Sequence, residues 1–224
     1  MAYWRIETAP YLQRAIDSVL RLPQQQHAAV ITGDLTDFGR SSEYDHLRDL
    51  LKPLPMPVYL MPGNHDDRTQ LRRSFADHAY LGESDFIQFS VTVGDLQLIA
   101  LDTINTGASN GFLCPTRLGW FAQRLQLCKG MPVVVAMHHP PFQTLIGHMD
   151  AVGLLEGATE LEALIAQHPN VERVICGHSR RAVQVRFGGT IAGTVPSPAG
   201  QVCLDLAHEV CPDLAREASS MWTL

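Results

Sequence analysis

Short apolar runs alternate with amphipathic stretches over the first three quarters of this 224-residue chain. Apolar runs at 28–32, 57–60, 133–137 and 171–176 predict buried strands. Helices are predicted where apolar side chains recur at helical spacing or where capping residues precede them, at 10–21, 41–51, 68–78 and 115–128. In the last of these, the candidate core positions are Leu118, Phe121, Leu125 and Leu127. A capping box over 159–162 predicts a further helix to about residue 168.

The pattern changes where strands follow one another without helices. Gly94-Asp95 separates apolar segments at 86–93 and 96–101, which predicts a hairpin. Beyond residue 177 come only short β-like segments, at 182–187, 190–193 and 201–206, and the tail from about residue 208 is expected to be loose. Residues 140–157 are long and irregular, as functional loops often are. The order predicts one α/β domain over 1–224, with a mixed sheet or two packed sheets covered by helices.

Composition excludes some classes of protein. Hydrophobic residues make up 46% of the chain, which is ample for a core, and the net charge of −6 argues against a basic surface for nucleic acid. No apolar run approaches the ~18 residues of a membrane helix, and no signal peptide is visible. The five cysteines are scattered and form no C-x-x-C pair. We therefore expect reduced thiols, a cytoplasmic location and no membrane partner.

Each of the four buried strands delivers a polar side chain at its carboxyl end. These side chains are Asp34, Asn64, His138 and His178. Open α/β sheets place their sites at the carboxyl ends of strands. One carboxylate, one amide oxygen and two imidazoles form a mixed set that suits Zn, Fe, Mn or Co. Glycines precede three of these residues and allow close approach of the backbone.

The motifs that carry these residues are Gly33-Asp34, Gly63-Asn64-His65-Asp66, His138 and Gly177-His178. In this order they resemble the calcineurin-like metallophosphoesterases, and the surrounding residues resemble the branch that contains cyclic-nucleotide and glycerophosphodiester phosphodiesterases. The resemblance runs from about residue 5 to about residue 206. It implies an αββα sandwich, with two mixed β-sheets flanked by helices and two metal ions at the strand ends. It also makes a homodimer plausible.

The resemblance assigns a role to each residue. Asp34 would bridge the two metals, and Asn64, His138 and His178 would complete one site. His65 would contact the phosphate and help the leaving group depart, and Asp66 would orient His65 through its other ring nitrogen. His139 would support the site from behind His138, although the two could exchange roles.

Two departures from the family pattern affect the second metal. No D-x-H occurs before Asp34, so the first strand is expected to be missing; a misplaced start codon, a shortened clone and gene loss all fit. Arg180 stands where the family has its last histidine ligand. A guanidinium roughly 5 Å from a divalent cation costs on the order of 6–7 kcal/mol at an effective dielectric near 20. We therefore expect one complete site, with Arg180 contacting the phosphate where the second metal would lie.

The sequence predicts a metal-dependent phosphodiesterase that uses metal-activated water. Its substrate would be a cyclic nucleotide such as 3',5'-cAMP or a small glycerophosphodiester. The alternative is a catalytically impaired relic that keeps one metal as a binding or assembly module. His65 favours the enzyme, since a structural metal site does not need it, whereas Arg180 and the absent D-x-H favour the relic.

Overall fold

The computed structural model describes residues 7–202 and 214–215. Its helices are α1 (Ala9–Leu20), α2 (Ser41–Leu51), α3 (Arg68–Ser74), α4 (Pro115–Leu127), α5 (Gly147–Asp150) and α6 (Ala158–Ala166), with a 3-10 turn at Ala79–Leu81. Its strands are β1 (Ala29–Ile31), β2 (Val58–Leu60), β3 (Phe89–Val93), β4 (Leu96–Leu101), β5 (Gly111–Phe112), β6 (Val133–Met137), β7 (Leu154–Glu156), β8 (Val171–Cys176), β9 (Val183–Phe187), β10 (Thr190–Thr194), β11 (Gln201–Val202) and β12 (Leu214–Ala215).

A six-stranded mixed sheet forms the centre of the fold, in the order β3-β4-β6-β8-β10-β9. The four inner strands β4, β6, β8 and β10 are parallel, and an antiparallel hairpin closes each edge. β4 and β6 are buried along nearly their whole length, as expected of strands covered on both faces. Parallel pairing brings the carboxyl ends of β6 and β8 to the same edge, where His138 and His178 follow.

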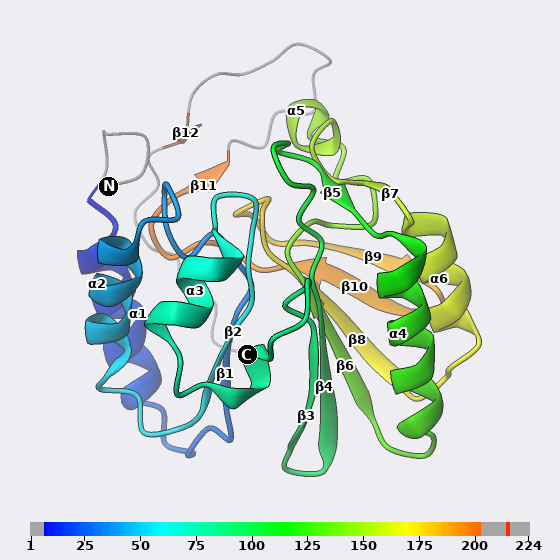
Figure 1. Ribbon diagram of the computed structural model, residues 1–224, viewed down its shortest axis with the longest axis horizontal. Helices are drawn as coiled ribbons and strands as arrows, with labels where there is room; N and C mark the ends of the chain where they lie inside the picture. The colour runs from blue at the N-terminus through cyan, green and yellow to red at the C-terminus, as the bar shows by residue number, and fades with distance from the viewer. Residues whose placement is uncertain (1–6, 203–213, 216–224) are drawn as a thin grey trace.

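Helices cover this sheet on both sides (Figure 1). α4 and α6 lie on one face, and on the other side stand the two parallel strands β1 and β2 with α1, α2 and α3 outside them. A large hydrophobic cluster includes Phe121 and Leu125 of α4 with the sheet, and a second joins α1, α2 and α3 to β2 through Ile16, Leu47 and Leu60. The site residues come from both of these layers.

The predicted mixed α/β fold, with sheet flanked by helices, is confirmed. Within the described residues the second sheet consists of two parallel strands, where the resemblance predicted a mixed sheet. None of the helices that the structure describes is long and apolar enough to span a bilayer. The predicted loose tail from about residue 208, and residues 203–206 of the last predicted strand, lie outside the described residues.

Three local predictions need correction. Leu127 is 73% exposed, because it lies about 200° around α4 from the buried Leu125 and so faces away from the sheet. α6 begins after Gly157, whose φ is 86°, with no side-chain cap, so the capping box over 159–162 does not form. The irregular segment at 140–157 contains α5 and β7, and β7 pairs with β5.

Asp102, at the end of β4, joins three elements through a buried ionic cluster. Its carboxylate accepts from Arg68 Nε at 2.6 Å and Nη2 at 2.7 Å, and from the peptide N–H of Ile87 at 2.8 Å. Arg117 of α4, only 2% exposed, lies 3.8 Å from the same carboxylate and donates to the Asp102 carbonyl. A fully buried carboxylate is therefore neutralised by two arginines, and it is in turn the counter-charge of the buried Arg117.

Asp102→Ala should lower the free energy of unfolding by about 3–5 kcal/mol, because Arg117 would remain buried without its counter-charge. Chemical denaturation followed by circular dichroism measures this. Asp49→Ala is the control, since Asp49 pairs with Lys52 in solvent and its loss should leave the denaturation midpoint unchanged. Equal effects of the two substitutions would show that the cluster around Asp102 contributes no more to the free energy of unfolding than an exposed ion pair.

Candidate metal centre

The four residues that the sequence analysis predicted as ligands come together at the carboxyl ends of four strands. Asp34 follows β1 and Asn64 follows β2, while His138 follows β6 and His178 follows β8. Two of them thus come from the small layer and two from the six-stranded sheet. The Thr32 carbonyl, 2.7 Å from His138 Nδ1, ties the two layers together at this point.

Three oxygen or nitrogen atoms surround one ring nitrogen of His138. Asp34 Oδ1, Asn64 Oδ1 and His178 Nδ1 each lie 3.2 Å from His138 Nε2. A tetrahedral ion with bonds of about 2.0–2.1 Å keeps neighbouring ligand atoms about 3.4 Å apart. The three contacts to His138 Nε2 therefore have about the separation of neighbouring ligands around such an ion.

Hydrogen bonding accounts for which nitrogen of His138 faces the cluster. A carbonyl only accepts, so the bond to Thr32 places a hydrogen on Nδ1 and leaves Nε2 with a lone pair in the neutral ring. That lone pair faces two further acceptor oxygens, of Asp34 and Asn64. Positive charge is needed at this point, and either a proton on Nε2 or a cation between the atoms supplies it.

The electrostatics of the cluster follow from the same contacts. Burial alone would raise the pKa of Asp34, but His138, His65 and His178 lower it well below its usual range. Burial alone would lower the pKa of His138, but contact with Asp34 raises it. Burial lowers the pKa of His178 to about 3, so this ring is neutral near pH 7. Its Nε2 is buried without a hydrogen-bond partner. A carboxylate and a neutral imidazole are the forms that bind metal.

Backbone strain collects at this site. Asp34, His178 and Arg180 have φ angles of 52°, 64° and 52°, and Leu145 is the one other non-glycine residue with positive φ in the described part of the chain. Such conformations cost of order 1–3 kcal/mol each and cluster at functional sites. Close packing accompanies the strain: a Cβ on Gly63 would overlap the Asp34 backbone, and one on Gly177 would overlap the Thr32 carbonyl oxygen.

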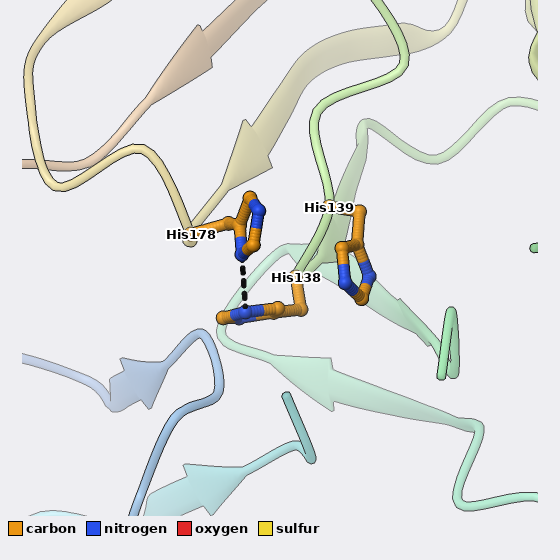
Figure 2. Close-up of side chains that lie close together, drawn as sticks. All are labelled: His138, His139 and His178. Carbon is orange, nitrogen blue, oxygen red and sulfur yellow. Dashed lines mark hydrogen bonds between the residues drawn. The ribbon is translucent and has the colours of Figure 1, made fainter. Parts of the chain in front are cut away.

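His139 also lies at the cluster, on the same segment as His138 (Figure 2). Histidines 138, 139 and 178 place one ring nitrogen each within 4.8 Å of one another. Both nitrogens of His139 are engaged, however: Nδ1 lies 2.8 Å from Thr103 Oγ1 and Nε2 lies 3.2 Å from the Ser109 carbonyl. The carbonyl requires a hydrogen on Nε2, so Nδ1 accepts from the threonine. The sequence interpretation took His138 as the ligand and left open an exchange with His139, and these contacts favour His138.

His65 is held by a different residue from the one predicted. Its Nδ1 donates to the Asp37 carbonyl at 3.0 Å, so the prediction that Asp66 orients this ring is wrong. Asp66 instead accepts from the N–H groups of Leu35 and Gly63 and from the Thr36 and Tyr44 hydroxyls, at 2.8–3.0 Å. It thereby fastens the loop that carries Asp34 to the loop that carries Asn64. Burial raises its pKa to about 6.

Two residues that support the proposed ligands were not predicted from the sequence. Tyr44, fully buried on α2, accepts from the Asp67 N–H and donates to Asp66, and nothing in the helical pattern of α2 indicates that role. Thr103 could have been found, because it follows β4 at the same sheet edge as His138.

Arg180 lies where the sequence placed it, beside Asp34. Its Nη2 is 3.8 Å from Asp34 Oδ2, and its side chain is 20% exposed. A cavity of about 420 Å³ opens next to this pair. It is lined by Asp34, His138, His178 and Arg180, and also by Leu12 of α1 and Leu47 of α2. A ligand in this cavity would meet both the polar cluster and apolar side chains of two helices.

Comparison with known proteins identifies the class. The calcineurin-like phosphoesterase family matches residues 7–181, and the chain belongs to this family. It is 30% identical to a probable glycerophosphodiester phosphodiesterase of Arcobacter nitrofigilis, over 100% of this chain and 83% of that protein. It is also 30% identical to a probable cyclic nucleotide phosphodiesterase of Rhodopseudomonas palustris, over 95% and 75%.

The fold agrees with this assignment. A dimetal phosphatase from Danio rerio has a similar structure, with a TM-score of 0.70, 17% identity, and coverage of 88% of this chain and 80% of that one. The predicted family is therefore confirmed, and the names of the relatives support the predicted phosphoric diester hydrolase. Calcineurin-like phosphoesterases bind divalent metal ions, which agrees with the cluster of histidines.

Gly177→Ala should weaken binding of a divalent ion about tenfold or more, because the added Cβ pushes Thr32 and His138 out of place. Titration of the metal-free chain with Zn²⁺ measures the affinity. Gly119→Ala, at an exposed position of α4 with nothing near its Cβ position, is the matched control and should leave the affinity unchanged. Unchanged affinity in Gly177→Ala would show that the ion does not bind beside this glycine.

Proposed function

We propose that this chain is a metal-dependent phosphodiesterase that hydrolyses a small phosphodiester, and that Asp34, Asn64, His138 and His178 hold one divalent ion. The observation that carries the proposal is the meeting of three of these side chains at 3.2 Å from the fourth. The mixed oxygen and nitrogen donors suit Zn, Fe, Mn or Co. Membership of the calcineurin-like phosphoesterase family supports the same conclusion.

When bound, the ion would offset the charge of the phosphodiester and activate water near neutral pH. Side chains around the ion would contact the phosphate, transfer the proton and hold the ligands in place. His65 follows the proposed ligand Asn64, and the peptide N–H of His65 donates to Asp34 Oδ1 at 3.3 Å. Because the Asp37 carbonyl holds its Nδ1, we assign its Nε2 to the phosphate and, with the ring in its protonated form, to proton transfer toward the leaving oxygen. Asp66 acts as a positioning residue that holds the two ligand loops together.

Arg180 is assigned to binding the phosphate. Its guanidinium lies beside Asp34 in the lining of the cavity. Its N–H donors have a fixed geometry that suits a pair of phosphate oxygens. The same positive charge disfavours a second cation next to Asp34. An arginine does not lower the pKa of water as a metal ion does, so Arg180 contributes to binding more than to the chemical step.

Two substrate classes agree with the names of the relatives: a glycerophosphodiester and a cyclic nucleotide such as 3',5'-cAMP. The cavity of about 420 Å³ has room for the larger of the two. The homodimer and the cytoplasmic location expected from the sequence stay predictions.

A second function is favoured by one observation, the contact of Arg180 with Asp34. An arginine in this place is compatible with a catalytically impaired relic that binds one metal and serves as a binding or assembly module. The two functions differ in a simple measurement, since the relic would bind metal and leave phosphodiesters intact.

Two histidine substitutions should separate metal binding from chemistry. The dialysed chain should contain about one equivalent of metal and hydrolyse bis(4-nitrophenyl) phosphate until a chelator is added. His178→Ala should lose both metal and turnover. His65→Ala should keep the metal and lower kcat. Because 4-nitrophenolate leaves with little help from an acid, the loss should be smaller than the roughly hundredfold or more expected of a general acid acting on a poor leaving group. Metal analysis and absorbance at the nitrophenolate band measure the two properties.

His27→Ala is the control, because this exposed histidine precedes β1, at the opposite end of the strand from Asp34. It should change neither property. Two tightly bound equivalents, activity that survives chelation, or full turnover in His65→Ala would contradict the assigned roles. Metal binding without hydrolysis in the unaltered chain would support the relic.

Arg180→Ala should raise the KM for the same phosphodiester about tenfold, since a hydrogen bond to a charged group contributes about 1.5–3 kcal/mol, and should change kcat less. Steady-state kinetics on the purified chain gives both constants. Arg181→Ala is the neighbouring control: its Nη1 donates to the Val202 carbonyl at 3.1 Å, and its loss should leave KM unchanged. Equal KM values for all three proteins would make Arg180 a bystander.

A further inference from the structure

His139 is a fully enclosed side chain at the candidate metal centre. It is 0% exposed and follows His138 at the end of β6. Its ring centroid lies 4.8 Å from that of His138, with the planes at 89°, and 4.7 Å from that of His178. Figure 2 shows the three rings around one point, with His138 and His139 on the same segment and His178 on another. His139 therefore packs against two of the four proposed ligands at once.

Hydrogen bonds fix the orientation of this ring. Nε2 donates to the Ser109 carbonyl, and Nδ1 accepts from Thr103 Oγ1. The same hydroxyl oxygen accepts from the peptide N–H of His139 at 3.3 Å. Thr103 is itself fully buried, and its carbonyl accepts from Phe112 of β5. The ring thus has one donor and one acceptor contact, both to the segment that follows β4.

Packing leaves the ring no second position. A Cβ on Gly111 would lie 2.6 Å from His139 Cβ and 2.6 Å from its Cγ. Gly111 is held in turn by its N–H, which donates to the Gly153 carbonyl at 2.9 Å. The imidazole is therefore confined between β5 on one side and the rings of His138 and His178 on the other.

We infer that His139 is a positioning residue. It sets the ring orientation of His138 and His178, so the position of the metal ion depends on where residues 103–111 lie. The inference rests on the proposed function, because it takes His138 and His178 as ligands. His139 itself offers no lone pair to an ion, since its acceptor nitrogen is occupied by Thr103. Groups that hold metal ligands in this way change metal affinity about 10–100-fold when removed.

Binding of Co²⁺ tests the inference without substrate. The visible absorption of bound Co²⁺ reports the number and arrangement of its ligands. His139→Phe keeps an aromatic ring and loses both hydrogen bonds, and Thr103→Val removes only the hydroxyl. Both should shift the Co²⁺ spectrum and weaken Co²⁺ binding about tenfold or more. His139→Gln, which retains one donor and one acceptor, should recover part of the affinity.

His168→Phe is the matched control for loss of a buried histidine. His168 is 5% exposed, its Nδ1 donates to the Leu164 carbonyl at 2.8 Å, and its Nε2 accepts from Gln126 at 3.1 Å. It lies just beyond α6, before β8 begins, and so at the other end of that strand from His178. Its substitution should lower the melting temperature and leave the Co²⁺ spectrum unchanged.

The outcomes separate the inference from the proposed function. An unaltered Co²⁺ spectrum and affinity in both His139→Phe and Thr103→Val would overturn the positioning role while leaving the metal centre in place. Spectral changes of the same size in His168→Phe would also overturn it, since general destabilisation would then explain them. If the unsubstituted chain bound no Co²⁺, the proposed function would fail and the inference with it.

Discussion

The rest of this structure depends on the crowding of electron-rich atoms around His138 Nε2. A carboxylate oxygen, an amide oxygen and a second imidazole nitrogen lie within 3.2 Å of it, and His138 itself is only 1% exposed. Burying such groups without positive charge is costly, because their dipoles repel one another in a medium of low polarity. The glycines, the left-handed backbone at Asp34 and His178, and the hydrogen bonds of Asp66 all serve to hold this arrangement.

The central features of the fold and site were predictable because they repeat along the chain. Each proposed ligand follows an apolar strand, and parallel strands bring their carboxyl ends to one edge. A pattern of this kind is visible in the sequence without knowing which strands are neighbours. The helices α1 and α2 were equally clear, since each keeps one apolar face over three turns.

What the sequence did not predict depends on contacts between distant segments. Asp66 was expected to orient His65, yet three of its four partners, Leu35, Thr36 and Tyr44, lie 22 to 31 residues away in the chain. The choice between His138 and His139 depends on Thr103 and Ser109, which reach the site only when β4 pairs with β6. Leu127 is apolar but follows the buried Leu125 by only two residues, which places it on the solvent side of α4, while the next residue, Cys128, is buried again.

The distribution of the proposed ligands has a mechanical consequence. Asp34 and Asn64 belong to the layer of β1 and β2, and His138 and His178 to the six-stranded sheet, and each layer has a hydrophobic cluster of its own. An ion held by all four would cross-link the two layers, as a disulfide joins two segments of a secreted protein. Part of its binding free energy would then appear as resistance to separation of the layers. Chelation would weaken the interface between the two clusters while leaving each cluster packed.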